Sequence, residues 1–392
     1  MSPAAQRAQF DFVRLAAEEP SSLYFEQFLR DGFAAWPSSY QSQFPGLSTW
    51  QGIAGLKRSL RTLAGAPDDW KVLLASQSLS LAWLATRSMF RVCGNVMTTD
   101  LSWPTYQHAI EQRARRAAAR VTVIPLRDQI LDHRWTTRDV ADYLATAFAK
   151  AECDGLFLPA VDHLGVRLPI REIVAAVQRR RSINFCFVDA AQAFCQVPID
   201  DCFEWADFIV AGSHKWLGAY LPMGIGWIKP KWSRSTVREG EVDSLLRFIQ
   251  HLDRDELHRH SETVNVLPLL TCSGAAQDRL LDGAWRGPPD DAYVRQWGLA
   301  DWLPVRPAPE LRSQIVLLEN RNGTARRQSV DAVRQIWLNH GRVITAYPGG
   351  HIRISAPRND ERHYTQSVEL NRSWDWNAFR QSDRGSIPSP LA

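Results

Sequence analysis

Short apolar segments alternate with helix-like segments through the middle of the chain. Helix-like stretches run from about Gln77 to Phe90, from near Tyr106, over Thr137–Lys150 and from Pro169 to about Arg180. The strand-like runs are Val72–Ala75, Asn95–Thr99, Val121–Leu126, Gly155–Ala160, Asn184–Asp189, Asp207–Ala211 and Gly224–Ile228. Strands and helices in alternation form crossover units with parallel strands. The pattern predicts an α/β fold with a mostly parallel central sheet and helices on both faces.

The alternation becomes looser after about Lys231. A polar segment that contains Gly and Pro, Asp282–Asp290, precedes two strand-like runs, Gln314–Leu318 and Ile352–Ser355, which flank a helix-like stretch at Ser329–His340. This half predicts a smaller C-terminal α+β domain. The expected domains are an N-terminal helical segment (1–45), a large α/β domain (46–245), the small domain (246–381) and a Pro/Ser-rich disordered tail (382–392).

Composition excludes several classes of protein. The chain has 392 residues, of which 45% are hydrophobic, so it can bury a large core without disulfides or metals. Its net charge is only +4 and its arginines are dispersed, which disfavours a nucleic-acid partner. No apolar run reaches the roughly 18 residues of a membrane helix, and the N-terminus lacks the pattern of a signal peptide. We therefore expect a cytoplasmic protein that binds neither nucleic acid nor membrane.

Lys215 has unusual surroundings for a lysine. It lies in a turn of small residues, Ala211–Gly218, directly after an apolar strand. Partial desolvation there would lower its pKa and make its amine a nucleophile. The alternative is an ordinary lysine whose stem packs while its head reaches solvent.

Groups near Lys215 in the sequence match the needs of pyridoxal phosphate (PLP). Asp189 ends a strand and can hold the proton of a pyridine nitrogen, and Gln192 can bind the ring hydroxyl. The phosphate needs hydroxyls and the amides of a helix N-terminus. The strand-to-helix turn Ser76-Gln77-Ser78 offers these, and Ser213 and His214 add two donors.

These motifs resemble the class V aminotransferases, fold type I PLP enzymes that include cysteine desulfurases, isopenicillin N epimerase-like proteins and kynureninase. The D-x-A-Q signature reads Asp189-Ala190-Ala191-Gln192 here, and S-x-H-K-like spacing follows at Ser213-His214-Lys215. The resemblance covers about residues 45–375. It implies a Schiff base between Lys215 and PLP, a quinonoid intermediate supported by Asp189, and a homodimer with shared active sites.

The resemblance also assigns roles outside this centre. Trp103 would stack on the cofactor ring, Arg353 would bind the substrate carboxylate, and Thr263 would reach the phosphate of the other subunit. Asp162 and His163 would lie near the substrate, where the family often has Asn, Ser or Thr. Core packing for Trp103, a structural role for His163 and a surface pairing for Arg353 remain alternatives.

The motifs do not decide the reaction on an α-amino acid. A desulfurase needs a nucleophilic cysteine late in the chain, and here no cysteine follows Cys272. β-Elimination from a bulky cysteine-type conjugate, a C–S lyase of specialised metabolism, is favoured because aromatic residues cluster near the motifs. The aromatic residues are Trp103, Tyr106, Trp216 and Tyr220. Transamination stays open, as do epimerisation, decarboxylating deamination and a cofactor-free binding protein.

The histidines His251, His258 and His260 lie close together in the sequence among Asp and Arg residues. We interpret them as part of a solvated helix face, so no metal site is expected.

Overall fold

A computed structural model describes most of the chain in two compact units. The described residues are 2–18, 26–132, 135–236, 243–282, 302–320, 323, 325–339 and 341–355. Residues 1–288 and 305–315 form the first unit, and residues 289–304 and 316–392 form the second. The expected tail at 382–392 and most of the polar segment Asp282–Asp290 lie outside the described residues. The domain boundaries expected from the sequence stay a prediction.

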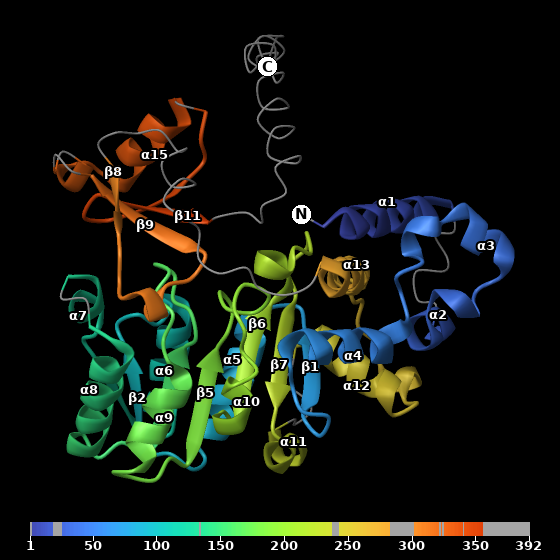
Figure 1. Cartoon of the computed structure of the whole chain (residues 1–392). Coiled ribbons are helices and arrows are strands. Elements are labelled where there is room, and N and C mark those ends of the chain that lie inside the picture. The colour runs from blue at the N-terminus through green and yellow to red at the C-terminus, as the bar shows by residue number, and fades with distance from the viewer. Residues whose placement is uncertain are drawn as a thin grey trace, which may run out of the picture. The chain divides into compact units, whose positions relative to one another are not determined.

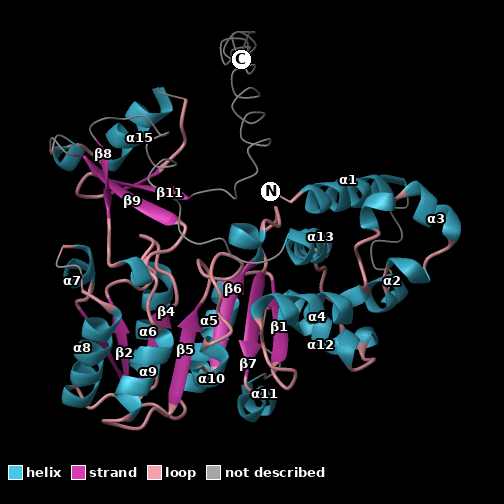
Figure 2. Ribbon diagram, viewed as in Figure 1, coloured by secondary structure: helices cyan, strands magenta, loops and turns pink. Residues whose placement is uncertain are grey.

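The first unit contains a seven-stranded sheet with the order β1-β7-β6-β5-β4-β2-β3 (Figures 1 and 2). β7 pairs antiparallel with both β1 and β6, whereas the pairs among β2, β3, β4, β5 and β6 are parallel. The mostly parallel α/β sheet predicted from the sequence is thus confirmed. The strands are β1 (Lys71–Ala75), β2 (Asn95–Thr99), β3 (Arg120–Ile124), β4 (Gly155–Pro159), β5 (Phe185–Asp189), β6 (Phe208–Gly212) and β7 (Gly224–Ile228).

Both faces of the sheet are covered by helices, which explains why the strands are almost continuously apolar. Successive side chains of β5 alternate between two cores: Phe185 and Phe187 join one, and Cys186 and Val188 join the other. α5 and α6 cover the first face, and α4, α8, α9 and α13 contribute to the core on the opposite face. The parallel strands therefore end at one shared edge of a rigid layer.

Several helices of this unit begin at a capping side chain or at a proline. Thr136 and Asp139 form a reciprocal capping box at the start of α8, and Pro104 opens α6. The helices are α1 (Pro3–Glu18), α2 (Glu26–Asp31), α3 (Ser38–Gln43), α4 (Gly52–Ala64), α5 (Ser78–Met89), α6 (Pro104–Arg116), α7 (Arg127–Leu131), α8 (Thr137–Lys150), α9 (Ile170–Gln178), α10 (Cys202–Trp205), α11 (Pro230–Thr236), α12 (Ser244–Asp253) and α13 (Leu267–Asp282).

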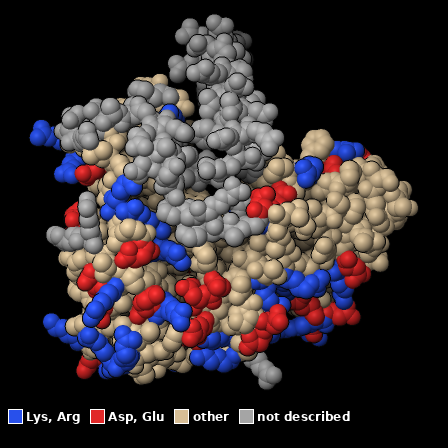
Figure 3. Space-filling model, viewed as in Figure 1, with Lys and Arg blue, Asp and Glu red and all other residues tan. Residues whose placement is uncertain are grey.

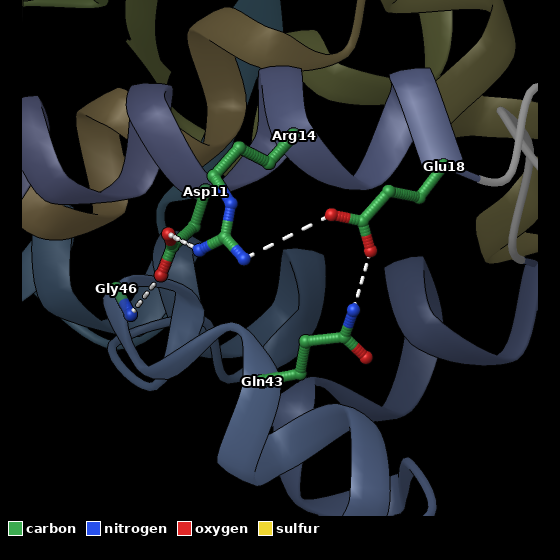
Figure 4. A network of polar contacts seen from close by, with 5 residues as sticks. All are labelled: Asp11, Arg14, Glu18, Gln43 and Gly46. Carbon is green, nitrogen blue, oxygen red and sulfur yellow. Dashed lines mark hydrogen bonds and ion pairs between the residues drawn. The ribbon is translucent and has the colours of Figure 1, made fainter.

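α1 is fixed to the rest of the unit through polar contacts as well as packing. Asp11 is buried and accepts a 2.6 Å hydrogen bond from the backbone N–H of Gly46, while Arg14 bridges Asp11 and Glu18 (Figure 4). Gln43 at the end of α3 donates to Glu18. The apolar face of α1 packs along α13.

The second unit has its own small core beneath a four-stranded sheet of order β10-β11-β9-β8. β10 and β11 pair antiparallel, and α15 places Trp337 against the sheet, where its ring lies 5.6 Å from that of Trp302. The elements are β8 (Trp302–Val305), β9 (Ile315–Asn320), α15 (Val330–Asn339), β10 (Thr345–Tyr347) and β11 (His351–Ser355).

The visible surface carries basic and acidic side chains side by side rather than in a single basic tract (Figure 3). Among the described helices, none combines the length and the apolar character that crossing a bilayer requires.

Candidate functional site

The turn that carries Lys215 follows directly on the carboxyl end of β6. Residues Ser213–Leu217 form a π-helical turn in which Lys215 leaves the helical region (φ −86°, ψ −109°). Gly218 ends the turn with φ +88°, a left-handed conformation that favours glycine. The side chain of Lys215 is exposed in the single chain, so the desolvation expected from the sequence is not provided by the chain alone.

Contacts from distant segments hold this turn in place. Arg279 on α13 donates to the backbone carbonyls of Trp216 and Leu217. The backbone N–H of Ser2 donates to the carbonyl of Gly218 at 3.0 Å, and Ser2 Oγ in turn donates to Asp278 on α13. The irregular backbone at Lys215 is therefore held by α13 and by Ser2, the residue that precedes α1.

Asp189 is a buried carboxylate at the carboxyl end of β5. It is only 5% exposed, and its Oδ1 accepts a 2.8 Å hydrogen bond from the backbone N–H of Ala191. Burial raises the pKa of Asp189 to about 6, and the positive charge of Lys215 opposes this rise. Lys215 thus lies close enough to Asp189 to act on it electrostatically.

Gln192 joins the β5 loop to the lysine turn. Its Oε1 accepts a 2.9 Å hydrogen bond from the indole Nε1 of Trp216. His214 precedes Lys215 in the turn, and partial desolvation together with the charge of Lys215 lowers its pKa. A neutral imidazole can either donate or accept at this position.

The N-terminus of α5 lies beside β7. A Cβ at Gly224 would meet the backbone of Gln77 and Ser78 at 2.5–2.7 Å, so glycine is needed for this close approach. Gln77 is the N-cap and is exposed. Ser78 accepts a 2.6 Å hydrogen bond from the hydroxyl of Tyr106, whose pKa burial raises.

Ser76 and Ser80 differ from Ser78, because their hydroxyls donate to Asp243 at 3.0 Å. Asp243 also caps α12 and accepts from the backbone N–H of Ser76 at 2.8 Å. Ser213, expected to bind phosphate, is fully buried and donates its hydroxyl proton to the carbonyl of Leu221 at 3.0 Å. Ser78 is therefore the serine of this loop best suited to bind an anion.

Trp103 and His163 lie together at the carboxyl edge of the sheet. Their ring centroids are 5.5 Å apart with the rings nearly perpendicular, and Trp103 remains 46% exposed. Asp162 has a different environment: it is buried, and its Oδ1 accepts from the backbone of Leu164 and Val166 at 3.0 and 2.7 Å. One oxygen of this carboxylate thus stabilises its own turn, and the substrate contact expected from the sequence stays a prediction.

Two buried oxygens at this edge have no hydrogen-bond partner among the described residues. They are Oδ2 of Asp162, after β4, and Oγ1 of Thr99, at the end of β2. Burial raises the pKa of Asp162 to about 7, against the opposing effect of its backbone hydrogen bonds and of Arg127. Buried polar atoms without partners are uncommon and suit a site that accepts a polar ligand.

The sequence also predicts site roles for Thr263 and Arg353. Thr263 is exposed in the segment before α13. Arg353 belongs to the second unit, where its guanidinium donates to Ser355 Oγ at 3.1 and 3.2 Å. Their roles remain predictions.

The cysteines do not offer an exposed nucleophile at the expected position. Cys272 is completely buried in α13, and burial raises the pKa of its thiol. A group of three or more potential metal ligands is absent from the described part of the chain.

Sequence reasoning missed several positioning residues. Neither Asp243 nor Arg279 stands out in the sequence, and Tyr106 is notable there only as an aromatic residue near the motifs. Ser76 and Asp243 are separated by 167 positions in the sequence, so no local spacing signals that they meet.

The chain was compared with known proteins. The sequence model described as "Aminotransferase class-V" matches residues 34–235. A putative L-cysteine desulfhydrase 1 from Oryza sativa subsp. japonica is 24% identical in an alignment of 263 positions, which covers 55% of this chain and 54% of that protein. This chain therefore spans about half the length of that curated relative.

Solved structures share the fold. The cystine C–S lyase C-DES, in complex with cysteine persulfide, superposes with a TM-score of 0.58 at 14% identity over 92% of this chain and 94% of that one. Ureidoglycine-glyoxylate aminotransferase from Bacillus subtilis gives a TM-score of 0.57 at 14% identity over 76% and 77%.

Proposed function

This chain belongs to the class-V aminotransferase family, and from this premise we propose that it is a PLP-dependent C–S lyase. Its substrate would be a bulky, cysteine-type α-amino acid in specialised metabolism, cleaved by β-elimination. The observation that carries the proposal is the electrostatic proximity of Lys215 and the buried Asp189 at adjacent strand ends.

The residues present fit PLP. Asp189 is a buried carboxylate, and burial raises its pKa. A protonated pyridine nitrogen beside it would stabilise its ionised form. The α5 N-terminus with Ser78 would hold the phosphate, and His214 would assist. Gln192 would bind the ring hydroxyl, and Lys215 would carry the cofactor covalently through Nζ. Trp103 would cover the ring.

When bound, PLP would supply the electron sink for bond cleavage at the substrate Cα. The substrate amine would displace Nζ of Lys215 from its bond to the cofactor, and the freed Nζ would then take the α-proton. The Cβ–S bond would break, and the sulfur would leave with the bonding pair as a thiolate. Hydrolysis of the remaining three-carbon fragment would give pyruvate and ammonia. Asp189 would hold the proton of the pyridine nitrogen throughout.

Four observations support elimination over related reactions. The similar rice protein is described as a cysteine desulfhydrase, and a structure of like fold is a cystine C–S lyase. Aromatic side chains of Trp103 and Tyr220 are half exposed and suit a bulky leaving group. The burial of Cys272 disfavours persulfide transfer to that residue.

A second candidate is an aminotransferase, because Bacillus ureidoglycine-glyoxylate aminotransferase has the same fold. An epimerase or decarboxylating deaminase of the family is a further alternative. The proposal includes a cytoplasmic homodimer, which the exposure of Thr263 supports because a partner subunit could contact it.

The test incubates the purified holoenzyme with S-substituted cysteines and measures pyruvate, ammonia and thiol. Release of all three without a keto acid supports elimination. If the reaction instead requires a keto acid and forms pyridoxamine phosphate, the enzyme is an aminotransferase. Lys215→Ala should abolish the reaction and the covalent link to PLP. Lys150→Ala, at the exposed end of α8, should behave as wild type.

A further inference from the structure

A hydrogen bond between two loops suggests how the cofactor's ring oxygen is controlled. We propose that the indole of Trp216 fixes the orientation of the Gln192 side-chain amide and thereby makes Gln192 a hydrogen-bond donor to the cofactor's ring oxygen. Trp216 is then a positioning residue that acts through Gln192. This inference rests on the proposed function.

The indole of Trp216 determines which of its two orientations the side-chain amide of Gln192 adopts. The Nε1–H of Trp216 can only donate, and it lies 2.9 Å from Oε1 of Gln192. If the amide were reversed, two N–H donors would face each other and the hydrogen bond would be lost. The –NH₂ group of Gln192 must therefore point away from Trp216.

The bond joins the two loops that carry the proposed reacting groups. Gln192 follows Asp189 by three residues after β5, and Trp216 is adjacent to Lys215 after β6, the next strand in the sheet. The backbone of Trp216 is itself fixed, because Arg279 donates to its carbonyl oxygen. Both partners are half-buried, which limits competition from water.

The orientation has a consequence for the ring oxygen. A deprotonated ring oxygen only accepts hydrogen bonds, so an amide –NH₂ stabilises it. A reversed amide would present its carbonyl oxygen and would favour the protonated form instead. Trp216 should thus lower the pH at which the bound cofactor changes its absorption spectrum.

Other charged or titratable groups surround this pair and stay unchanged in the variants below. They are Lys215 and His214 on the turn, Asp189 at the end of β5 and Arg279 on α13.

The experiment titrates the holoenzyme with acid and base while recording the absorption of bound PLP. Trp216→Phe keeps an aromatic ring but removes the N–H. We expect the spectral midpoint to rise by about 0.5–1 pH unit, and PLP to bind about three- to tenfold more weakly. Trp135→Phe, whose ring packs on Tyr143 on α8, is the matched control and should change neither value.

Gln192→Glu provides a second variant in case Trp216→Phe does not fold. It retains an acceptor for Trp216 but cannot donate when ionised, so it should also raise the midpoint. In the Gln192→Glu background, Trp216→Phe should add little further shift. A spectral midpoint in Trp216→Phe equal to that of wild type would overturn the inference. If only Gln192→Glu folds, a wild-type midpoint in that variant would overturn it.

Failure of the proposed function gives a different result. Borohydride reduction followed by peptide mass analysis tests whether PLP is joined to Lys215. If wild type shows no such adduct, the proposed function and this inference both fail. If the adduct forms in wild type and in Trp216→Phe, with identical titrations, only the role of Trp216 is refuted.

Discussion

The hydroxyl of Tyr106 donates a 2.6 Å hydrogen bond to Oγ of Ser78 across the interface of α6 and α5. Because Oγ accepts from Tyr106, its own proton is available to another acceptor. Tyr106 is only 5% exposed, and burial together with the charge of Asp189 raises its pKa, so it remains a donor at neutral pH. The pair can therefore present an oriented proton to an anion at the start of α5.

Tyr106→Phe should weaken PLP binding without unfolding the protein. Loss of one hydrogen bond of about 1 kcal/mol corresponds to an approximately fivefold rise in Kd. Fluorescence titration of the apoenzyme with PLP measures this change. Tyr143→Phe on α8 serves as the control, and an unaltered Kd in Tyr106→Phe would show that Ser78 needs no orientation.

Gly224→Ala should destabilise the protein, because the new methyl group would meet the backbone of Gln77 and Ser78 at 2.5–2.7 Å. We expect a cost of about 1–3 kcal/mol and weaker PLP binding. Gly226→Ala on the same strand meets only side-chain atoms of Phe208 and Leu81 at 3.2–3.4 Å and should cost less. Urea denaturation of both variants, with and without PLP, provides the comparison; equal costs would contradict it.

Asp162→Asn should change the pH dependence of stability. Burial raises the folded-state pKa of Asp162 to about 7 from the ordinary 3.8, so the folded state holds the proton more tightly than the unfolded state. Its contribution favours folding below pH ~4 and is lost as the pH rises through 7. Asparagine keeps the acceptor for Leu164 and Val166 but cannot ionise.

Relative to wild type, Asp162→Asn should therefore gain about 2–4 kcal/mol in unfolding free energy between pH 4 and pH 8. Denaturant titrations at several pH values measure this difference. Asp142→Asn, half exposed on α8, is the control. A pH-independent difference between Asp162→Asn and wild type would mean that Asp162 titrates normally.

Arg279→Gln should loosen the lysine turn, since Arg279 donates to the carbonyls of Trp216 and Leu217. We expect faster amide hydrogen exchange in residues 213–219 and slower capture of PLP by Lys215. Arg259→Gln alters an exposed ion pair with Glu256 and should leave this exchange unchanged. Wild-type exchange rates in Arg279→Gln would assign the rigidity of the turn to other contacts.

The central sheet was predictable because each of its strands is a short apolar run between turn residues. Gly224–Ile228 and the helix Thr137–Lys150 match the sequence-based bounds, since Gly224 and the capping residue Thr136 mark where they start. β8 and β10 were not predicted. They have four and three residues, too few to show an alternating pattern.

The candidate site was predictable only where its functional residues form a motif with a fixed spacing along the sequence. Asp189 ends β5, Lys215 lies in the turn directly after β6, and the two carry a recognisable spacing. Long-range partners such as Asp243 for Ser76 depend on the packing of α12, which the sequence does not reveal. The backbone role of Asp162 depends on its burial, which is decided by tertiary structure.

The docking of α1 has a consequence for biosynthesis. Ser2 binds Asp278, 276 positions later, and the apolar face of α1 is covered by α13. While the ribosome is still making the intervening sequence, Phe12 and Leu15 have no native cover from that helix. The nascent polypeptide should then be prone to aggregation and to capture by chaperones until α13 emerges.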